Sequence, residues 1–527
     1  MTSATPSVTR SYDIIGFGDE VPGVLALVCA AREYRRRTGR FPKTLLMFKG
    51  NSPDGVGGHL VRGGLAYLDR AMVPADVRQS LNLSTFGDPS AIYKEFLQKA
   101  GVAQIALDPR KADAALRQML SEVKADIISR VQIQSVLKKD DLLAGIRLTR
   151  GETYLARQFI DSTVNAELAQ YAGVDKVQGF GTFGLPESEL PVTLVFETEG
   201  LTIAALKQFE LDFLKRLTNP NDAEAQRFIQ IAAGNDAKLI EQLRKDLIDA
   251  NGQLKTMYVG LDHIDVRCKA LSIAYHSFRG KRWSLEKSGA ILDQPNIAIL
   301  SPTRLSWNAL LCACTGLQAE QLARAAAKPT PAMLQEITFL DRWFKSLGAT
   351  AVRPATELYI RHAGNVLGAV DPLTGAKMMA GAVPANEALG TFGYHLDVRG
   401  GIVGLGAKAR EKDLTSVSFH HPPLFNVGIQ HALLNTVPNL AVISPGSGYD
   451  GYACAAGRIV EFNVAVGQGV GIAAAIALLS NRALADISNL EVRQVLVQTN
   501  QLPRIYGTSY LAEAIRLQTF EQLMMTA

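Results

Sequence analysis

The residues near the start of the sequence have the pattern of a short strand that runs through a glycine-rich turn into a helix. Residues 11–16 have the length and apolar content of a buried strand, and residues 22–37 form an Ala- and Leu-rich segment of helical length. The turn between them, from Gly16 to Gly23, reads GFGDEVPG. Backbone N–H groups at the start of such a helix bind phosphate well, so we predict an α/β nucleotide-binding unit. A tight strand-to-helix turn without a ligand is the alternative.

Two alignments of this turn with the glycine fingerprint of nucleotide-binding folds are possible. In the fingerprint the first glycine makes the turn, the second admits the pyrophosphate and the third lets helix and strand pack closely. Starting at Gly16 leaves the third position without glycine, whereas starting at Gly18 puts Glu20 second and Gly23 third. We prefer the second alignment. It assigns to the cofactor Gly18, Glu20, Val21, Pro22 and Gly23.

A second predicted strand, residues 43–48, is followed by Lys49, where such folds normally carry an acid for the ribose hydroxyls. Lysine cannot accept a hydrogen bond from a hydroxyl, so we expect Lys49 to meet a phosphate or the ribose to be held differently. Residues 57–65 then place two glycine pairs around a polar segment. They predict a second close-approach loop, with an ordinary surface turn as the alternative.

Further segments resemble the FAD-dependent oxidoreductases, in particular the glutathione-reductase-like flavoproteins with a single FAD domain and a GG-rich loop. Residues 160–163 (IDST) and 167–173 (ELAQYAG) resemble that family's strand end and the helix after it. Asn439 begins a strand like the family's last one, and Arg458 and Gly467 follow at the family's spacing. The resemblance implies an FAD-dependent enzyme.

The resemblance also implies which residues would contact FAD. The segment from Gly467 to Gly471 is expected to open a helix whose positive end faces the flavin pyrimidine, with a purely structural glycine-rich helix start as the alternative. Beyond the first turn, the implied cofactor residues are Lys49, Gly57, Gly58, Val131, Arg458, Gly467, Gly469, Val470 and Gly471.

Catalytic candidates follow from the chemistry that such a flavoprotein performs. A base often removes a proton as hydride leaves carbon, and histidine suits this role at neutral pH. His59 and Arg62 lie in the loop expected beneath the flavin, while His395 and His421 precede the last cofactor segment. Solvated loop residues and a structural turn are the alternatives.

The fold class that these segments predict is α/β: a discontinuous Rossmann-like FAD-binding domain and a mixed-sheet substrate domain with a helical insertion. Strands are expected at 193–197 and 358–362, and helices at 202–217, 222–249 and 331–347. The predicted boundaries are 10–180 and 437–485 for the FAD domain, 181–436 for the substrate domain with its insertion at about 202–350, and 486–527 for a helical tail.

Composition narrows the classes of partner and compartment. The net charge is only +5, from 55 basic and 50 acidic residues, which argues against a nucleic-acid partner. Five scattered cysteines indicate a reducing compartment, and we expect Cys312 and Cys314, in an apolar run, to be buried helix residues rather than metal ligands. The apolar stretches 21–31 and 470–480 are too short to span a bilayer. A cytoplasmic protein without metal or membrane span is expected.

The leading functional hypothesis is an FAD-dependent dehydrogenase or oxidase that takes a hydride from an unidentified small organic substrate. The electron acceptor and the oligomeric state stay open. A flavin-binding protein of low or no turnover, acting as a partner or assembly factor, is the alternative. No second glycine-rich strand-turn-helix occurs in the middle of the chain, so no separate NAD(P) domain is expected.

Overall fold

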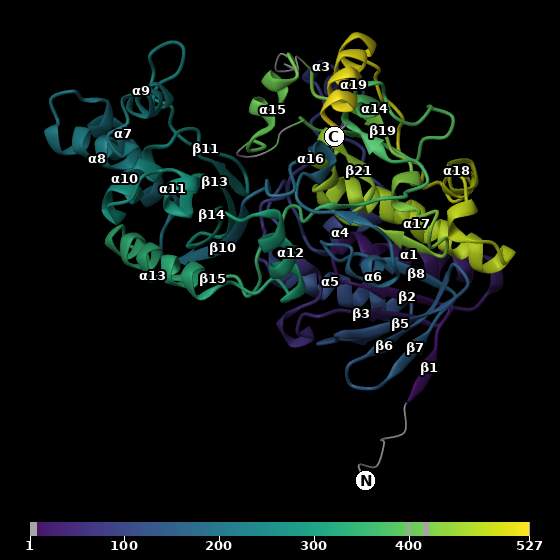
Figure 1. Ribbon diagram of the computed structural model, residues 1–527. Coiled ribbons are helices and arrows are strands. Elements are labelled where there is room, and N and C mark those ends of the chain that lie inside the picture. Colours follow the sequence, from purple (N-terminus) through teal and green to yellow (C-terminus); the bar gives the residue numbers. More distant parts are fainter. Residues whose placement is uncertain (1–7, 397, 399–400, 415–420, 526–527) are drawn as a thin grey trace.

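The computed structural model describes residues 8–396, 398, 401–414 and 421–525 of the 527-residue chain. Figure 1 shows a lobe formed by the middle of the sequence (teal) beside a larger lobe that contains both ends of the chain (purple, blue and yellow). We call them the middle lobe and the main lobe. The sheet of the main lobe positions the candidate site.

The main lobe is built on a parallel sheet of five strands in the order β20-β8-β2-β3-β4. Its central strands are continuous apolar runs because helices or a second sheet cover both faces. Strand order and parallel pairing are those of a Rossmann-like domain, which confirms the predicted fold class. The strands are β2 Ile14–Phe17, β3 Thr44–Met47, β4 Asp126–Ile128, β8 Gln158–Asp161 and β20 Leu440–Val442.

Side chains alternate between the two faces of this sheet. Ile14 and Leu46 join the core on the helical face, whereas Ile15 and Leu45 face a small second sheet. The second sheet has the order β1-β7-β6-β5 and fills the crossover between β4 and β8. Its strands are β1 Thr9–Ser11, β5 Ile133–Lys139, β6 Leu142–Leu148 and β7 Thr153–Leu155.

Two long helices, α1 (Val21–Thr38) and α17 (Val460–Ser480), pack against each other in the core of the main lobe. A Cβ on Gly467 would lie 2.6 Å from the carbonyl oxygen of Pro22, and one on Gly471 would overlap that of Ala26. The two helices therefore cross closely because α17 has glycine at these points. In the described part of the chain α17 alone is long and apolar enough to cross a membrane, and 89% of its apolar window is buried.

The predicted role of the glycines in α17 is wrong. The helix begins at Val460, so Gly467, Gly469, Val470 and Gly471 lie in its interior and cannot present a free helix end to a flavin. A Cβ on Gly469 would lie 2.6 Å from Ile429, so this glycine also serves close packing. The sequence was misleading because small residues in a buried helix look like a glycine-rich helix start.

The middle lobe contains a sheet of six strands in the order β11-β12-β13-β14-β10-β15, all paired antiparallel. The helices Ile203–Thr218, Ala270–Arg279 and Pro331–Ser346 pack with it, whereas Ala223–Ala233 and Ala237–Asp246 pack on other helices (Figure 1). Its strands are β10 Val192–Glu199, β11 Tyr258–Val259, β12 His263–Asp265, β13 Ala290–Ser301, β14 Arg304–Cys312 and β15 Ala351–Pro354. Its helices are α7 Ile203–Thr218, α8 Ala223–Ala233, α9 Ala237–Asp246, α10 Ala270–Arg279, α11 Leu285–Ser288, α12 Gly316–Arg324 and α13 Pro331–Ser346.

Four expectations for this lobe need correction. The segment 202–350 is not only helical, because β13 and β14 are its longest strands. Cys312 ends β14 and Cys314 is half-buried just after it, so neither lies in a helix. Short apolar runs fit a buried strand or a buried helix equally well. The helix expected at 222–249 is divided at Gly234, which has φ +60°. Residues 358–362 form no strand and make only a bridge from Tyr359 to Thr193.

The remaining elements connect and cover the two lobes. They are α2 Gly58–Val61, α3 Ala75–Ser80, α4 Ala91–Lys99, α5 Pro109–Glu122, α6 Glu167–Tyr171, α14 Gly375–Met379, α15 Leu405–Glu411, α16 Cys454–Gly457, α18 Asn489–Gln498 and α19 Leu511–Met525. Short strands pair as β9 Lys176–Val177 with β16 Asn365–Val366, β17 Leu373–Thr374 with β21 Tyr449–Asp450, and β18 Thr391–Gly393 with β19 Leu424–Asn426.

The close crossing of α1 and α17 predicts the effect of one added methyl group. We expect Gly471→Ala to lower the free energy of unfolding by about 1–3 kcal/mol, because a backbone carbonyl cannot move aside as a side chain can. Gly406→Ala on α15 is the control, since its Cβ would meet nothing nearer than 3.7 Å. Urea unfolding followed by circular dichroism measures both variants, and equal stability of the two would contradict the crossing.

Candidate active site

Two glycines bring the start of α1 against the end of β8. Gly18 has φ +93°, and a Cβ there would lie 2.6 Å from the backbone nitrogen of Thr163. A Cβ on Gly23 would overlap the side chain of Ser162, whose Oγ donates a hydrogen bond of 2.8 Å to the Gly18 carbonyl. Gly18 therefore makes the turn and Gly23 allows the helix to pack closely on the strand, which are the roles of the first and third glycines of the fingerprint.

Two carboxylates of the turn itself bind the second glycine loop. Asp19 is buried and accepts a hydrogen bond of 2.9 Å from the backbone N–H of Gly57. Glu20 accepts one of 3.2 Å from the N–H of His59 and also pairs with the imidazole Nδ1 of that residue. Glu20 rests against Gly58, where any Cβ would overlap the carboxylate. The two glycine loops are thus joined by the side chains of the first.

Arg62 lies at the centre of this arrangement. Its guanidinium donates to Asp19 Oδ1 at 2.8 Å and to Glu357 Oε1 at 2.8 Å, and it stacks 5.0 Å from the ring of Phe48. Burial lowers the pKa of Arg62, but Asp19 and Glu357 more than offset this and raise it above the usual value. A Cβ on Gly50 would lie 2.5 Å from the guanidinium carbon. The space beside the end of β3 is therefore filled by Arg62.

His59 completes what we call the loop cluster: Asp19, Glu20, His59, Arg62 and Glu357. The ring of His59 stacks on Tyr359 with 4.8 Å between centroids. Its Nε2 is buried and has no hydrogen-bond partner among the described residues. His59 and Arg62 are thus brought together as the sequence suggested, but both are engaged by acidic side chains of the protein.

Lys49 is engaged with the protein in the same way. It forms an ion pair with Glu167 of α6 and donates a hydrogen bond of 2.7 Å to the carbonyl of Arg324 at the end of α12. Burial raises the pKa of Glu167, and the nearby Lys49 partly offsets this. Val131, the remaining predicted cofactor residue of this half, donates its backbone N–H to the carbonyl of Phe48 at 3.2 Å.

In this conformation the residues of the turn do not fit the pyrophosphate of FAD. The carboxylates of Asp19 and Glu20 are held beside the start of α1 by the N–H groups of Gly57 and His59 in the second glycine loop. A pyrophosphate at the turn would lie close to both acids, and this juxtaposition of like charges is unfavourable. The position at the end of β3 is closed by Arg62 and by the pair of Lys49 with Glu167.

His395 and Arg458 lie away from the loop cluster, and both line a cavity of about 620 Å³ between the two lobes. His395 is exposed, while the buried guanidinium of Arg458 lies 5.4 Å from the ring centroid of Tyr394. Tyr67 contributes from the main lobe and donates a hydrogen bond of 2.7 Å to Asp265 of the middle lobe. We call this site the lobe cavity. Its ionisable lining residues are Tyr67, Asp69, Arg70, Arg78, Asp265, Tyr394, His395 and Arg458.

His421 is not among the residues that line the lobe cavity. Its Nδ1 pairs with Glu513 of α19 at 2.9 Å, and its ring stacks on Tyr510 at 4.7 Å. The proposal that it is catalytic therefore receives no support from the geometry. The C-terminal segment contacts this exposed side chain, and the contact had no signal in the local sequence.

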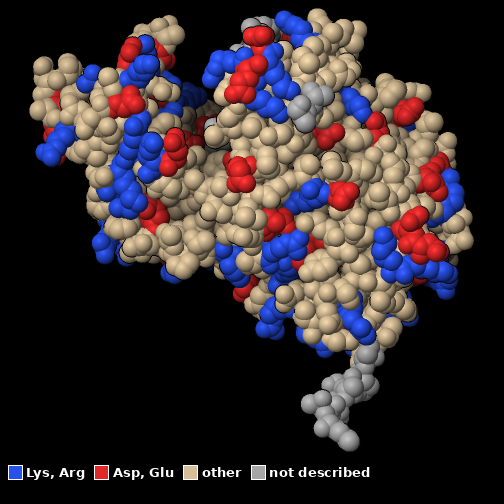
Figure 2. All heavy atoms as spheres, viewed as in Figure 1, with Lys and Arg blue, Asp and Glu red and all other residues tan. Residues whose placement is uncertain are grey.

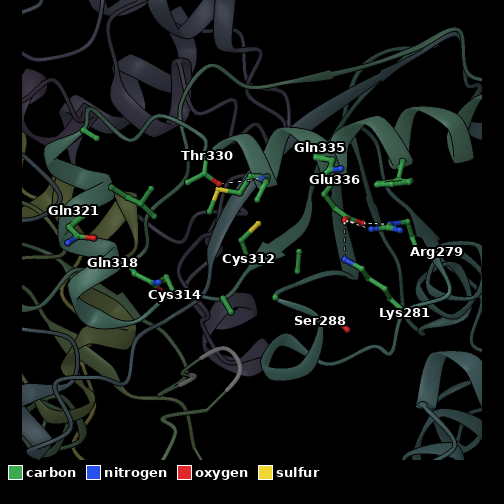
Figure 3. Close-up of a pocket in the computed structure, with 18 residues that line it drawn as sticks. Arg279, Lys281, Ser288, Cys312, Cys314, Gln318, Gln321, Thr330, Gln335 and Glu336 are labelled. Atoms are coloured by element: carbon green, nitrogen blue, oxygen red, sulfur yellow. Dashed lines mark hydrogen bonds and ion pairs between the residues drawn. The ribbon is translucent and has the colours of Figure 1, made fainter.

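A second cavity of about 770 Å³ lies in the middle lobe between the end of β14, α12 and α13 (Figure 3). Figure 3 shows Glu336 turned toward Arg279, which it binds at 2.9 Å. Burial raises the pKa of both lining thiols, Cys312 and Cys314, to about 12, so they are protonated at neutral pH. Gln321 lines this cavity from one face of α12, and we call it the α12 cavity.

Several residues that shape these sites were not found by sequence reasoning. Asp19 stands next to Glu20, and two adjacent acids in a phosphate-type turn were a signal that could have indicated it. Glu357, Glu167 and Arg70 lie far from the turn in sequence or carry no motif, so only the folded chain brings them into place.

Figure 2 shows basic and acidic side chains interspersed on the visible face.

Comparison with solved structures finds similar chains of low identity. A geranylgeranyl bacteriochlorophyll reductase-like protein from Thermoplasma acidophilum has a TM-score of 0.37 and 11% identity, over 98% of this chain and 89% of that one. L-proline dehydrogenase from P. horikoshii has a TM-score of 0.32 and 8% identity, over 93% and 99%. A probable FAD-dependent monooxygenase from Pseudomonas aeruginosa has 0.33 and 10%, over 98% and 100%.

Sequence comparison is more decisive. No curated protein sequence matches the chain. A sequence model of the FAD-dependent oxidoreductases matches residues 23–496, which is most of its length. The narrower glutathione-reductase-like assignment stays a prediction. The chain therefore belongs to the FAD-dependent oxidoreductase family, a family of enzymes whose cofactor is FAD.

Proposed function

We propose that the chain is a dehydrogenase or oxidase that passes a hydride from a small organic anion to FAD, and that this substrate binds in the lobe cavity. The observation that carries the proposal is the charge of that cavity. Arg70, Arg78 and Arg458 line it together with His395, against two carboxylates, Asp69 and Asp265. Its volume of about 620 Å³ is ordinary for a small-molecule site.

The lining residues support distinct roles on the substrate side. An arginine can hold a carboxylate through two parallel hydrogen bonds, which fixes orientation as well as position. His395 is exposed at the same cavity and can accept the proton that leaves as the substrate is oxidised. Asp265 is less available, because the hydroxyl of Tyr67 already donates to it.

The α12 cavity is the less suitable substrate site. Its cationic Arg279 is already bound by Glu336 and lies 3.6 Å from the ring centroid of Phe339. It opens on the face of α12 that carries Gln321, whereas Glu320 on the other face binds Lys176 of the main lobe. The lobe cavity is the more suitable substrate site, because it borders the main lobe, which contains the Rossmann-like domain.

A second candidate is a flavin-binding protein with low or no turnover that acts as a partner or assembly factor. The loop cluster favours it, since the acids Asp19 and Glu20 stand in the turn where a pyrophosphate would bind and would repel its charge. A substrate panel under anaerobic conditions separates the two candidates, because only an enzyme bleaches its flavin.

We also propose a reducing compartment such as the cytoplasm. All five cysteines are free and four are buried, which supports this location. The electron acceptor of the proposed reaction is oxygen, a quinone or a protein carrier.

The proposed substrate site predicts a charge-dependent loss of affinity. We expect Arg70→Gln to raise the organic-acid concentration for half-maximal flavin bleaching by about 10- to 100-fold, since a charged hydrogen bond contributes roughly 1.5–3 kcal/mol. Arg227→Gln, on the exposed surface of α8, is the matched control. Anaerobic titration of FAD-loaded protein with small carboxylic acids and neutral alcohols measures it. Bleaching by the neutral compounds alone would refute the proposed substrate class.

The contact between Gly23 and Ser162 predicts a compensating pair of substitutions. We expect Gly23→Ala to lower Tm and FAD retention, because its methyl overlaps Ser162 and overpacking costs about 1–3 kcal/mol. When Ser162→Gly is added, we expect most of the lost Tm and FAD retention to return. The double variant is compared with the Ser162→Gly single variant. Thermal unfolding and the FAD found in the filtrate after ultrafiltration give the two readouts. A Gly23→Ala variant as stable as the wild type would contradict this contact.

A further inference from the structure

A buried histidine, His362, lies between the start of the middle-lobe sheet and the main lobe. Its Nδ1 lies 2.8 Å from Oε1 of Glu189, which stands shortly before β10. Its Nε2 lies 2.8 Å from Oδ1 of Asn365 in β16. The side chains of His362 and Glu189 are 1% and 0% exposed, so these contacts are shielded from solvent. Both ring nitrogens therefore face oxygen atoms of the protein.

The side-chain amide of Asn365 is oriented by the main lobe. Its Nδ2 donates hydrogen bonds of 2.9 and 3.1 Å to the carbonyls of Pro445 and Ser447, in the loop that follows β20. An amide nitrogen has two hydrogens, and both are used in these bonds. The atom of Asn365 that faces the imidazole is therefore the oxygen, which can only accept. Nε2 of His362 must carry a hydrogen.

The contact with Glu189 places a hydrogen on the other ring nitrogen. Oε1 of Glu189 also accepts a hydrogen bond of 2.7 Å from the backbone N–H of Leu190. An oxygen that accepts from this N–H acts as a carboxylate oxygen toward His362 as well, so the hydrogen between them lies on Nδ1. The N–H of Gly364, 3.5 Å from Nδ1, is too distant to replace this contact. With hydrogen on both nitrogens, the ring is an imidazolium.

The charges around the ring agree with this assignment. Burial lowers the pKa of His362, but Glu189 and Asn365 more than offset this and raise it above the usual value. Lys176 of β9 opposes the charge of the ring, but it is itself paired with Glu320 at 2.6 Å. Burial raises the pKa of the neighbouring thiols to about 12, so they are neutral at physiological pH. The other ionisable side chains around the pair are Arg361, Cys314 and Cys454.

We infer that His362 is a buried imidazolium that fastens the loop after β20 to the start of the middle lobe in a pH-dependent way. The charged ring donates to Glu189 on one side and to Asn365 on the other, and Asn365 in turn holds the loop. We call these three residues the imidazolium link. Loss of the proton removes one donor and leaves the buried carboxylate of Glu189 without its counter-charge, which is costly.

The direction of the pH dependence follows from the raised pKa. A group whose pKa is higher in the folded than in the unfolded protein contributes its full stabilisation below the unfolded pKa. For His362 that reference value is 6.5. The contribution of the imidazolium link is therefore complete below pH 6.5 and is lost as the pH rises through the raised pKa of the folded protein.

Nuclear magnetic resonance of isotope-labelled histidine tests the charge directly. The chain has eight histidines, and the signal of His362 is assigned by its loss in His362→Gln or by its change in Glu189→Gln. At pH 6.5 we expect hydrogen on both ring nitrogens, with titration only at higher pH. In Glu189→Gln the ring should titrate below pH 6.5, because burial then acts without the counter-charge. This variant retains the ring, so it tests the charge even if His362→Gln does not fold.

Thermal unfolding between about pH 6 and pH 9 tests the link. We expect the loss of Tm in His362→Gln to be largest at the acidic end and to shrink as the pH rises. His431→Gln is the matched control, because burial lowers the pKa of His431 to about 3 and keeps this buried ring neutral throughout. Its loss of Tm should not change with pH. In hydrogen exchange at one pH, the amide of Val366, which donates to the Gly446 carbonyl at 2.9 Å, should exchange faster in His362→Gln than in the wild type.

Three results would overturn the inference. The first is a His362 ring with a single hydrogen at pH 6.5 in the wild type. The second is an unchanged pKa of His362 in Glu189→Gln. The third is a loss of Tm in His362→Gln that is as independent of pH as that of His431→Gln. These readouts use neither FAD nor substrate, so their outcome is independent of the oxidation proposed for the lobe cavity.

Discussion

The packing of α1 against its two neighbours is the constraint on which the rest of the main lobe depends. On one side Gly23 lets the helix lie against Ser162 at the end of β8, and on the other Gly467 and Gly471 let α17 cross it at backbone distance. Each contact involves a glycine because no side chain would fit. Since β8 and α17 belong to distant parts of the chain, α1 joins its two ends and sets the position of the glycine turn.

The loop cluster connects this turn to the middle lobe. The backbone carbonyl of Arg62 accepts hydrogen bonds of 3.1 and 3.2 Å from the N–H groups of Thr356 and Glu357. Its guanidinium also binds the carboxylate of Glu357. A similar link runs from Lys49 to the end of α12. A change in the turn that frees Arg62 would therefore also loosen contacts between the lobes.

The sequence predicted the larger elements and the family correctly, since these depend on patterns that are local or widely shared. The strand at 14–17 and the helix after it lie where the apolar runs and turn residues predicted them. The last parallel strand lies near Leu440, where the family resemblance predicted it. The family model confirms the flavoprotein assignment. The predictions failed where one composition suits two structures. The apolar run ending at Cys312 is a strand, and Gly467–Gly471 lie inside a helix that begins at Val460.

The sequence alone therefore determined that this chain has a Rossmann-like domain, a glycine turn of altered composition and membership of the FAD-dependent oxidoreductases. It also showed Glu20 and Lys49 at positions where glycine and an acid are usual. Only the tertiary structure decided what those residues do, because their partners lie elsewhere in the chain: His59 for Glu20, and Glu167 for Lys49. The sequence shows that a residue is unusual at its position. Only folding brings it together with the group that compensates its charge.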